Sequence, residues 1–180
     1  WDGKIYAYNS TTGEELWNVN LDVEIRSSPL AVDDKIFAAA NDGIVYLMNY
    51  LDGSFIYGID NGVDKEDEGG LISSPAASEG VIYYGVYENQ ESGLLVAFDY
   101  KKNEKKWSFS TNYPIWATPL VDGDYVYFGD FEGRIYKLNK KTGNKVWQYK
   151  VEESLDYYPL IHSNLILEEG KGMSTISLTV

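Results

Sequence analysis

Residues 3–17 carry the sequence GKIYAYNSTTGEELW, and the same frame returns three times along the chain. The returns lie at 43–57 (GIVYLMNYLDGSFIY), 93–107 (GLLVAFDYKKNEKKW) and 133–147 (GRIYKLNKKTGNKVW), and the aligned columns need no gaps. Every copy ends on an aromatic residue, namely Trp17, Tyr57, Trp107 and Trp147. A period of about 40 to 50 residues that keeps one aromatic in phase indicates an array of equal structural units.

A second motif lies between these copies and ends on a proline. Its four stretches are RSSP, ISSP, WATP and DYYP, and they end at Pro29, Pro75, Pro119 and Pro159. Each is followed by a turn and then by a hydrophobic run such as KIFAAA. Each unit therefore predicts four short strands: A at the proline motif, B in the hydrophobic run, C in the IYAYN-type run and D at the aromatic. We predict an all-β protein, a β-propeller of four-stranded antiparallel blades, because a β-sandwich would not keep one aromatic in phase.

The aligned columns resemble the quinoprotein-like (PQQ-type) β-propeller repeat, whose blade motif is Ala-x-Asp-x-x-Thr-Gly-x-x-x-Trp. The first copy matches this motif at Ala7, Thr12, Gly13 and Trp17, with Asn9 in place of the aspartate. The resemblance implies that the four repeated aromatics dock one blade on the next: Trp17, Tyr57, Trp107 and Trp147. It also implies that strand A lines a central channel and strand D lies outermost. The D-to-A and B-to-C loops then share one face, the top, and the other turns share the bottom.

The repeats set the expected domain organisation. We expect one β-propeller domain over residues 1–180, with repeats at roughly 1–40, 41–86, 87–130 and 131–180. The chain begins and ends inside expected blades, whereas the family resemblance implies a ring of seven or eight. An open ring would leave bare strand edges. We therefore expect that the remainder of a longer chain, or a second copy in a homodimer, completes the ring.

Composition narrows the classes of partner. The net charge of −13 argues against nucleic acid and against an anionic membrane surface, since both reward positive charge. There is no cysteine, so disulfides and thiolate metal sites are excluded. No apolar run is long enough to span a bilayer, and we expect no membrane insertion.

An enzyme is the alternative function that the resemblance implies, because some family members are quinone-dependent dehydrogenases. Those enzymes have an adjacent cysteine pair beside the quinone, a calcium site and a catalytic aspartate. This chain has no cysteine and no matching calcium ligands, so we expect no cofactor, no metal and no catalytic residue. A carbohydrate-active enzyme with a carboxylate pair stays open, because none of the 28 acidic residues is singled out by its spacing.

Three further features are explained better by solvated surface than by chemistry. The acidic stretch Asp64–Gly69 resembles the first half of a calcium loop, but the closing glutamate position holds Pro75. His162 is the single histidine and is expected beside a bottom turn. The lysine pairs 101–102, 105–106 and 140–141 are expected on a solvated bottom rim.

One column varies while the frame around it repeats. The residues three positions before each strand-A proline are Arg26, Ile72, Trp116 and Asp156, and Tyr157 and Tyr158 replace the small residues of the other copies. We predict a ligand site at the channel mouth, built from Arg26, Trp116, Asp156, Tyr157 and Tyr158. The predicted function is non-catalytic binding or scaffolding of a protein or polysaccharide partner, in a periplasmic or extracellular setting at the cell envelope.

Overall fold

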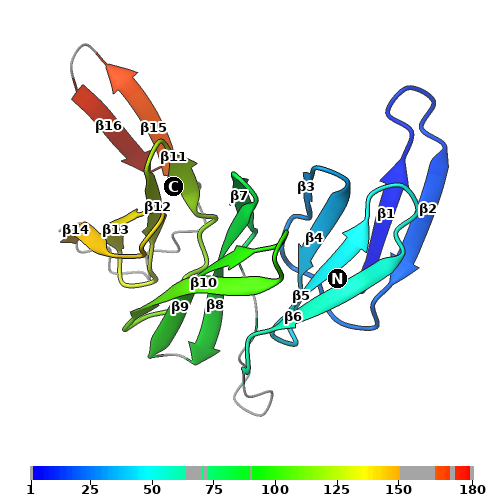
Figure 1. The fold of residues 1–180 in the computed structure, drawn as a ribbon, viewed down its shortest axis with the longest axis horizontal. Coiled ribbons are helices and arrows are strands. Elements are labelled where there is room, and N and C mark those ends of the chain that lie inside the picture. The colour runs from blue at the N-terminus through cyan, green and yellow to red at the C-terminus, as the bar shows by residue number, and fades with distance from the viewer. Residues whose placement is uncertain are drawn as a thin grey trace.

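A computed structural model describes residues 2–63, 70, 73–89 and 91–150, and the strand backbones 165–170 and 173–178. Every element in this part of the chain is a β-strand (Figure 1). Three sheets have four antiparallel strands and two have a pair of strands. The predicted all-β fold with four-stranded blades is confirmed.

The complete blades are meanders in which each strand pairs with the next one along the chain. Their strands are β3 (Leu30–Val32), β4 (Lys35–Ala39), β5 (Ile44–Asn49) and β6 (Phe55–Asp60); β7 (Ala76–Ser78), β8 (Val81–Asn89), β9 (Ser92–Asp99) and β10 (Glu104–Thr111); and β11 (Leu120–Asp122), β12 (Tyr125–Gly129), β13 (Arg134–Asn139) and β14 (Lys145–Lys150). The paired strands at either end are β1 (Lys4–Tyr8) with β2 (Glu15–Asn20), and β15 (Leu165–Gly170) with β16 (Met173–Leu178). The wider sequence spacing before the third copy of the repeat comes partly from the long β8–β9 hairpin and partly from a longer connection between Tyr57 and Pro75.

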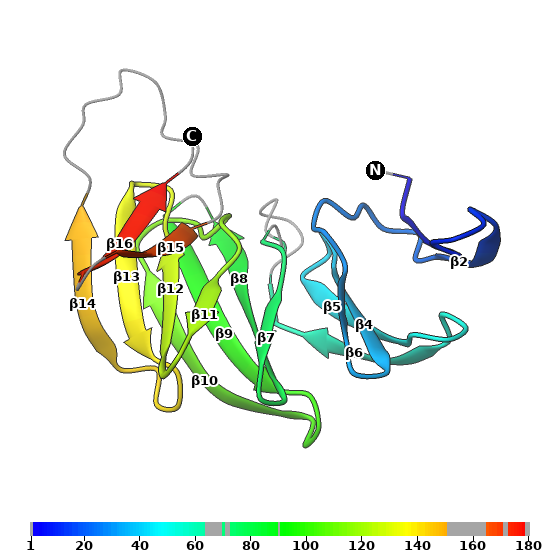
Figure 2. The same cartoon turned by 90° about the horizontal axis from the view of Figure 1, so that it is seen from above.

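The blades stand side by side in an arc. The short first strands β3, β7 and β11 lie on the inner side, and the last strands β6 and β10 lie on the outer side (Figure 1). Seen at right angles, the strands run between two faces (Figure 2). One face carries the connections between blades together with the B-to-C turns, and the other carries the A-to-B and C-to-D turns.

The core is a series of layers between neighbouring blades. Phe37 and Leu47 of one blade pack in a single buried cluster with Ile82 and Tyr84 of the next. A second cluster joins β8–β9 to β12–β13 in the same way. Because the middle strands β4, β8, β9 and β12 are covered on both faces, their sequences are largely apolar and do not alternate.

A repeated contact fastens the outer part of each blade to its neighbour. Trp17 donates its indole N–H to the Tyr50 carbonyl at 3.2 Å, and Trp107 donates to the Lys140 carbonyl at 3.0 Å. The Tyr57 hydroxyl donates to the carbonyl of the corresponding residue of the next blade, Tyr100, at 3.3 Å. These geometries support the proposal that the repeated aromatics dock the blades.

The fourth aromatic, Trp147, has its ring centroid 6.3 Å from that of Tyr127 in its own blade. All four repeated aromatics are half-buried. Strand D is outermost, and one edge of each ring therefore meets solvent. No helix able to span a bilayer occurs among the described residues.

Candidate functional site on the top face

The top face is built where the connection entering a blade crosses the B-to-C turn of that same blade. The Asn41 backbone N–H donates to the Glu24 carbonyl at 2.9 Å. At the corresponding place in the β11–β14 blade, the Phe131 N–H donates to the Pro114 carbonyl at 2.8 Å. The two blades therefore present the same backbone arrangement to the solvent.

In the β3–β6 blade this arrangement carries charged and polar side chains. Arg26 donates from Nη2 to the Glu24 carboxylate at 3.0 Å, and the Asn41 amide donates to the same oxygen at 2.7 Å. The hydrogen bond from Arg26 is the main cause that holds the pKa of the Glu24 carboxyl below its usual value, and the bond from Asn41 acts in the same direction. The carboxylate therefore stays ionised and holds the half-exposed guanidinium in a fixed place.

In the β11–β14 blade the same positions carry aromatic rings. Trp116 stands where Arg26 does, and its ring centroid lies 4.5 Å from that of Phe131 at a tilt of 50°. Both rings are half-buried. An aromatic pair with part of its surface in solvent offers apolar contact area that is already ordered, which lowers the entropic cost of binding.

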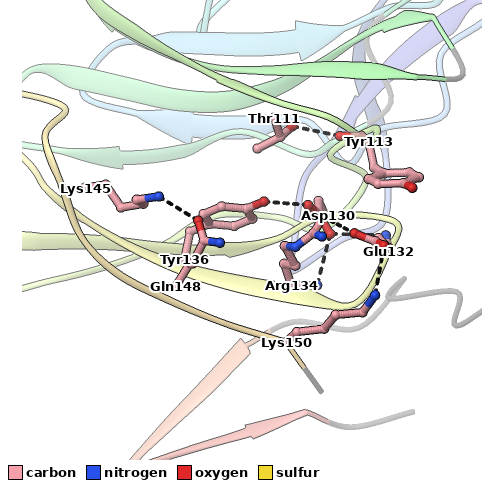
Figure 3. A network of polar contacts seen from close by, with 9 residues as sticks. All are labelled: Thr111, Tyr113, Asp130, Glu132, Arg134, Tyr136, Lys145, Gln148 and Lys150. Carbon is pink, nitrogen blue, oxygen red and sulfur yellow. Dashed lines mark hydrogen bonds and ion pairs between the residues drawn. The ribbon is translucent and has the colours of Figure 1, made fainter. Parts of the chain in front are cut away.

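A polar network extends the site over the B-to-C turn of the same blade (Figure 3). Asp130 is buried and accepts from the Tyr136 hydroxyl at 2.7 Å and from the Arg134 backbone N–H at 3.0 Å. Glu132 makes ion pairs with Arg134 and with Lys150, the latter at 2.8 Å. Burial raises the pKa of the Asp130 carboxyl, and the hydrogen bonds that it accepts oppose this shift only in part.

The network orders the top-face turn of this blade. The Asp130 carboxylate is the acceptor for two backbone N–H groups of the turn, because Glu132 N also donates to it at 3.1 Å. In the β3–β6 blade the Asp130 column holds Ala40, which has no carboxylate. There Asp42, two residues later, accepts from the Tyr46 hydroxyl at 2.7 Å. Each of these two blades thus fixes its turn by an aspartate–tyrosine pair, but the aspartate comes from a different position.

Two of the predicted site residues, Arg26 and Trp116, occupy equivalent positions in different blades. The other predicted members, Asp156, Tyr157 and Tyr158, lie outside the described residues, as does Ile72. Sequence reasoning missed Glu24, Asn41 and Phe131, which are the partners of the two predicted residues. Aligning the B-to-C turns, Asn41-Asp42-Gly43 on Phe131-Glu132-Gly133, would have found two of them.

The bottom lysines are not all solvated. Lys140 is buried, and its Nζ lies 3.4 Å from Glu79 Oε2 and 3.4 Å from Ser78 Oγ of the preceding blade. Lys101 makes a similar bond between blades, 3.2 Å from Asp33 Oδ2, although both side chains are exposed. The expectation of a solvated rim is therefore wrong for Lys140, because the turn that carries it is covered by the neighbouring blade.

Two other candidates raised by the sequence lie outside the described residues: the acidic stretch 64–69 and His162. Across the ranges that the structure describes, no three Asp, Glu, His or Cys side chains are grouped so as to hold a metal ion.

The tryptophan of one blade lies against the turn glycine of the next, Trp17 on Gly53 and Trp107 on Gly143. Four-stranded blades fastened in this way define a propeller of the quinoprotein-like class. The sequence profile of the family described as outer membrane protein assembly factor BamB matches residues 2–60 and 60–167, and the chain belongs to this family.

Similar proteins of known sequence include an assembly factor and dehydrogenases. Outer membrane protein assembly factor BamB of Kangiella koreensis is 26% identical over 93% of this chain and 42% of its own length. Quinohemoprotein alcohol dehydrogenase ADH-IIG of Pseudomonas putida is 24% identical over 91% of this chain and 24% of its own length. The chain thus spans less than half the length of either relative.

Solved structures share the fold. BamB from Moraxella catarrhalis superposes with a TM-score of 0.66 at 19% identity, over 82% of this chain and 46% of that one. A europium-containing methanol dehydrogenase superposes with a TM-score of 0.78 at 15% identity, over 96% and 43%. At such identities the likeness shows architecture alone, and one architecture hosts several functions.

Proposed function

We propose that this chain is part of a non-catalytic propeller that holds a protein partner at the cell envelope. One observation carries the proposal: two blades share the same hydrogen-bonded top-face backbone, yet one displays Arg26 with Glu24 and the other displays Trp116 with Phe131. Since the blade frame does not dictate these side chains, they are available for a ligand. Membership of the BamB family, whose description is an assembly factor of the outer membrane, supports the setting.

A protein partner suits this face better than a polysaccharide does. Sugar rings stack on an open indole face, whereas the Trp116 ring is tilted against Phe131 and half-buried. Protein interfaces, in contrast, are enriched in tryptophan and arginine anchors set among ordered polar groups. The Arg26–Glu24 pair and the Trp116–Phe131 pair are anchors of that kind in different blades of one arc.

The test is site-specific photocrosslinking of the whole protein in its own cells. A photoreactive residue is placed at Arg26, at Trp116 or, as the bottom-face control, at the exposed Lys141. We expect the first two positions to capture the same protein, which is then identified and purified. Its dissociation constant should rise about tenfold or more with Arg26→Glu and with Trp116→Ala, and stay unchanged with Lys141→Ala.

Two results would overturn the proposal. One is a crosslinked partner from position 141 together with no crosslink from either top-face position. The other is steady oxidation of an alcohol by the whole protein loaded with pyrroloquinoline quinone, which would favour the enzyme alternative.

A further inference from the structure

The hairpin β5–β6 carries a group of exposed apolar side chains at the bottom and outer edge of its blade. The exposed fractions are 52% for Tyr50, 78% for Leu51, 60% for Phe55 and 43% for Ile56. We call these four residues the hairpin patch. Leu51 lies in the turn between the two strands, and Phe55 and Ile56 open the outer strand β6.

The equivalent hairpins carry lysine at several of the same columns, although the Ile56 column holds Leu16 and Val146 in two of them. Phe55 and Ile56 correspond to Lys105 and Lys106 in the next blade, and Leu51 corresponds to Lys101. In the β11–β14 blade the columns of Leu51 and Phe55 hold Lys141 and Lys145. The blade frame therefore accepts lysine at these columns, and the apolar residues are not required for folding.

Strand β6 is also a sheet edge. It ends the order β3-β4-β5-β6, and among the described residues it pairs only with β5. Outer edges are commonly protected from further pairing by charged side chains, above all by lysine. Strands β10 and β14 begin with Glu104 and Lys145, but β6 has no charged residue before Asp60.

Gly58 lies within β6 and is exposed. A Cβ at Gly58 would lie 2.9 Å from Ile44 Cγ2 of the paired strand β5 and 4.0 Å from Phe55 Cζ, so two apolar side chains flank the glycine. Phe55 also contacts Tyr46, with the ring centroids 6.3 Å apart. A glycine in an outer strand favours close approach by a second backbone, and the neighbouring ring supplies apolar surface beside it.

The charged residues around β6 indicate what kind of peptide segment this edge would bind. Asp52 and Asp60 are the charged residues of the hairpin 50–60, and Glu14 and Glu15 are those of the preceding hairpin 10–20. The hairpin 140–150, in contrast, holds four lysines and no acid. The acidic side of the outer rim is therefore also the apolar side.

We propose that the free edge of β6 pairs with an extended segment of a partner protein, apolar in its centre and lysine- or arginine-rich at its ends. Backbone hydrogen bonds to β6 hold the segment, as in other cases of strand addition. The hairpin patch receives its apolar side chains, and Asp52 and Asp60 attract its basic ends. This site is distinct from the top face, so it stands whether or not the top face binds a protein.

The experiment uses a fluorescent synthetic peptide of alternating valine and threonine with two lysines at each end. Fluorescence anisotropy measures its binding to the whole protein and to the variants Phe55→Lys and Ile56→Lys. The control is Val146→Lys, since Val146 fills the Ile56 column in β14. We expect each of the two β6 variants to weaken binding about tenfold or more, and the control to leave it unchanged. N-methylation of alternate peptide amides should abolish binding, because it removes the donors that pair with the edge.

Circular dichroism establishes that all three variants are folded, which the lysines found in the other blades lead us to expect. The proposal fails if the lysine-flanked peptide does not bind. It fails also if Val146→Lys weakens peptide binding as much as Ile56→Lys does. It fails also if a glutamate-flanked peptide of the same centre binds as well. If sedimentation velocity shows a dimer that Ile56→Lys dissociates while no peptide binds, the occupant is a second copy of this chain and the proposed partner is wrong.

Discussion

Gly143→Ala tests the contact that joins one blade to the next. Gly143 lies in the turn between β13 and β14 with a φ of +72°, directly beneath the Trp107 indole. An added Cβ would lie 2.7 Å from Trp107 Cδ2 and 2.9 Å from its Cε3, well inside van der Waals contact. The indole must therefore shift, and the hydrogen bond from Nε1 to the Lys140 carbonyl shifts with it.

Two costs add up in this variant, and the chain offers a control that separates them. An alanine held at positive φ costs about 1–2 kcal/mol. Overpacking against the indole adds about 1–3 kcal/mol, so the total loss of unfolding free energy is about 2–5 kcal/mol. Gly13 has a φ of +75° in the equivalent turn, but nothing lies within 4 Å of an added Cβ. Gly13→Ala should therefore show the backbone cost alone.

Urea denaturation followed by far-ultraviolet circular dichroism measures both variants. Trp107→Leu, alone and combined with Gly143→Ala, completes a double-mutant cycle, and the smaller side chain should recover most of the overpacking cost. Equal losses for Gly13→Ala and Gly143→Ala, together with no coupling to Trp107, would refute the docking proposal.

Two further predictions concern buried polar groups. Ser73 is fully buried and accepts from the Gly85 N–H at 2.6 Å, so Ser73→Ala should cost about 1–3 kcal/mol in urea denaturation by leaving that donor unpaired. A loss below that range would mean that water replaces the hydroxyl. Burial raises the pKa of Asp130, so stability should fall as the pH rises from 3.8, the ordinary value, through the higher pKa of the folded state. Asp130→Asn should lack this fall when denaturation is repeated at several acid and neutral pH values, and an unchanged pH profile would contradict the assignment.

The fold was predictable from the sequence because the blade frame is local and repeated. The turn glycines, the D-strand aromatics and the proline motif each recur in a fixed column, and the blades follow from them. The role of the first serine in the Ser-Ser-Pro motif was not visible. Ser27 donates to the Ala39 carbonyl at 2.8 Å and accepts from the Ala39 N–H at 3.1 Å, so one hydroxyl replaces a backbone pairing of strand A with strand B.

The site was only half predictable, because its contacts join segments far apart in sequence. Arg26 and Trp116 stood out by variation within their column, which needs only the repeat alignment. Phe131 lies against Trp116 because the connection that enters the blade crosses the B-to-C turn. The repeat pattern of the sequence does not reveal this crossing. Lys140 was misassigned for the same reason, since only the packed blades show that Glu79 of the preceding blade lies above its ammonium group.

The two kinds of position in this protein should respond to mutation in opposite ways. Gly143 and Trp107 belong to the frame, where a change disturbs the contact between blades and lowers stability. Arg26 and Trp116 stand on a backbone arrangement that forms with either side chain, so their replacement should change binding while the unfolding free energy changes little. A repeated frame therefore lets the top face diverge from blade to blade without a loss of the fold. The hairpin patch extends this logic to the outer edge, where lysine in the other blades shows that folding does not demand Phe55 or Ile56.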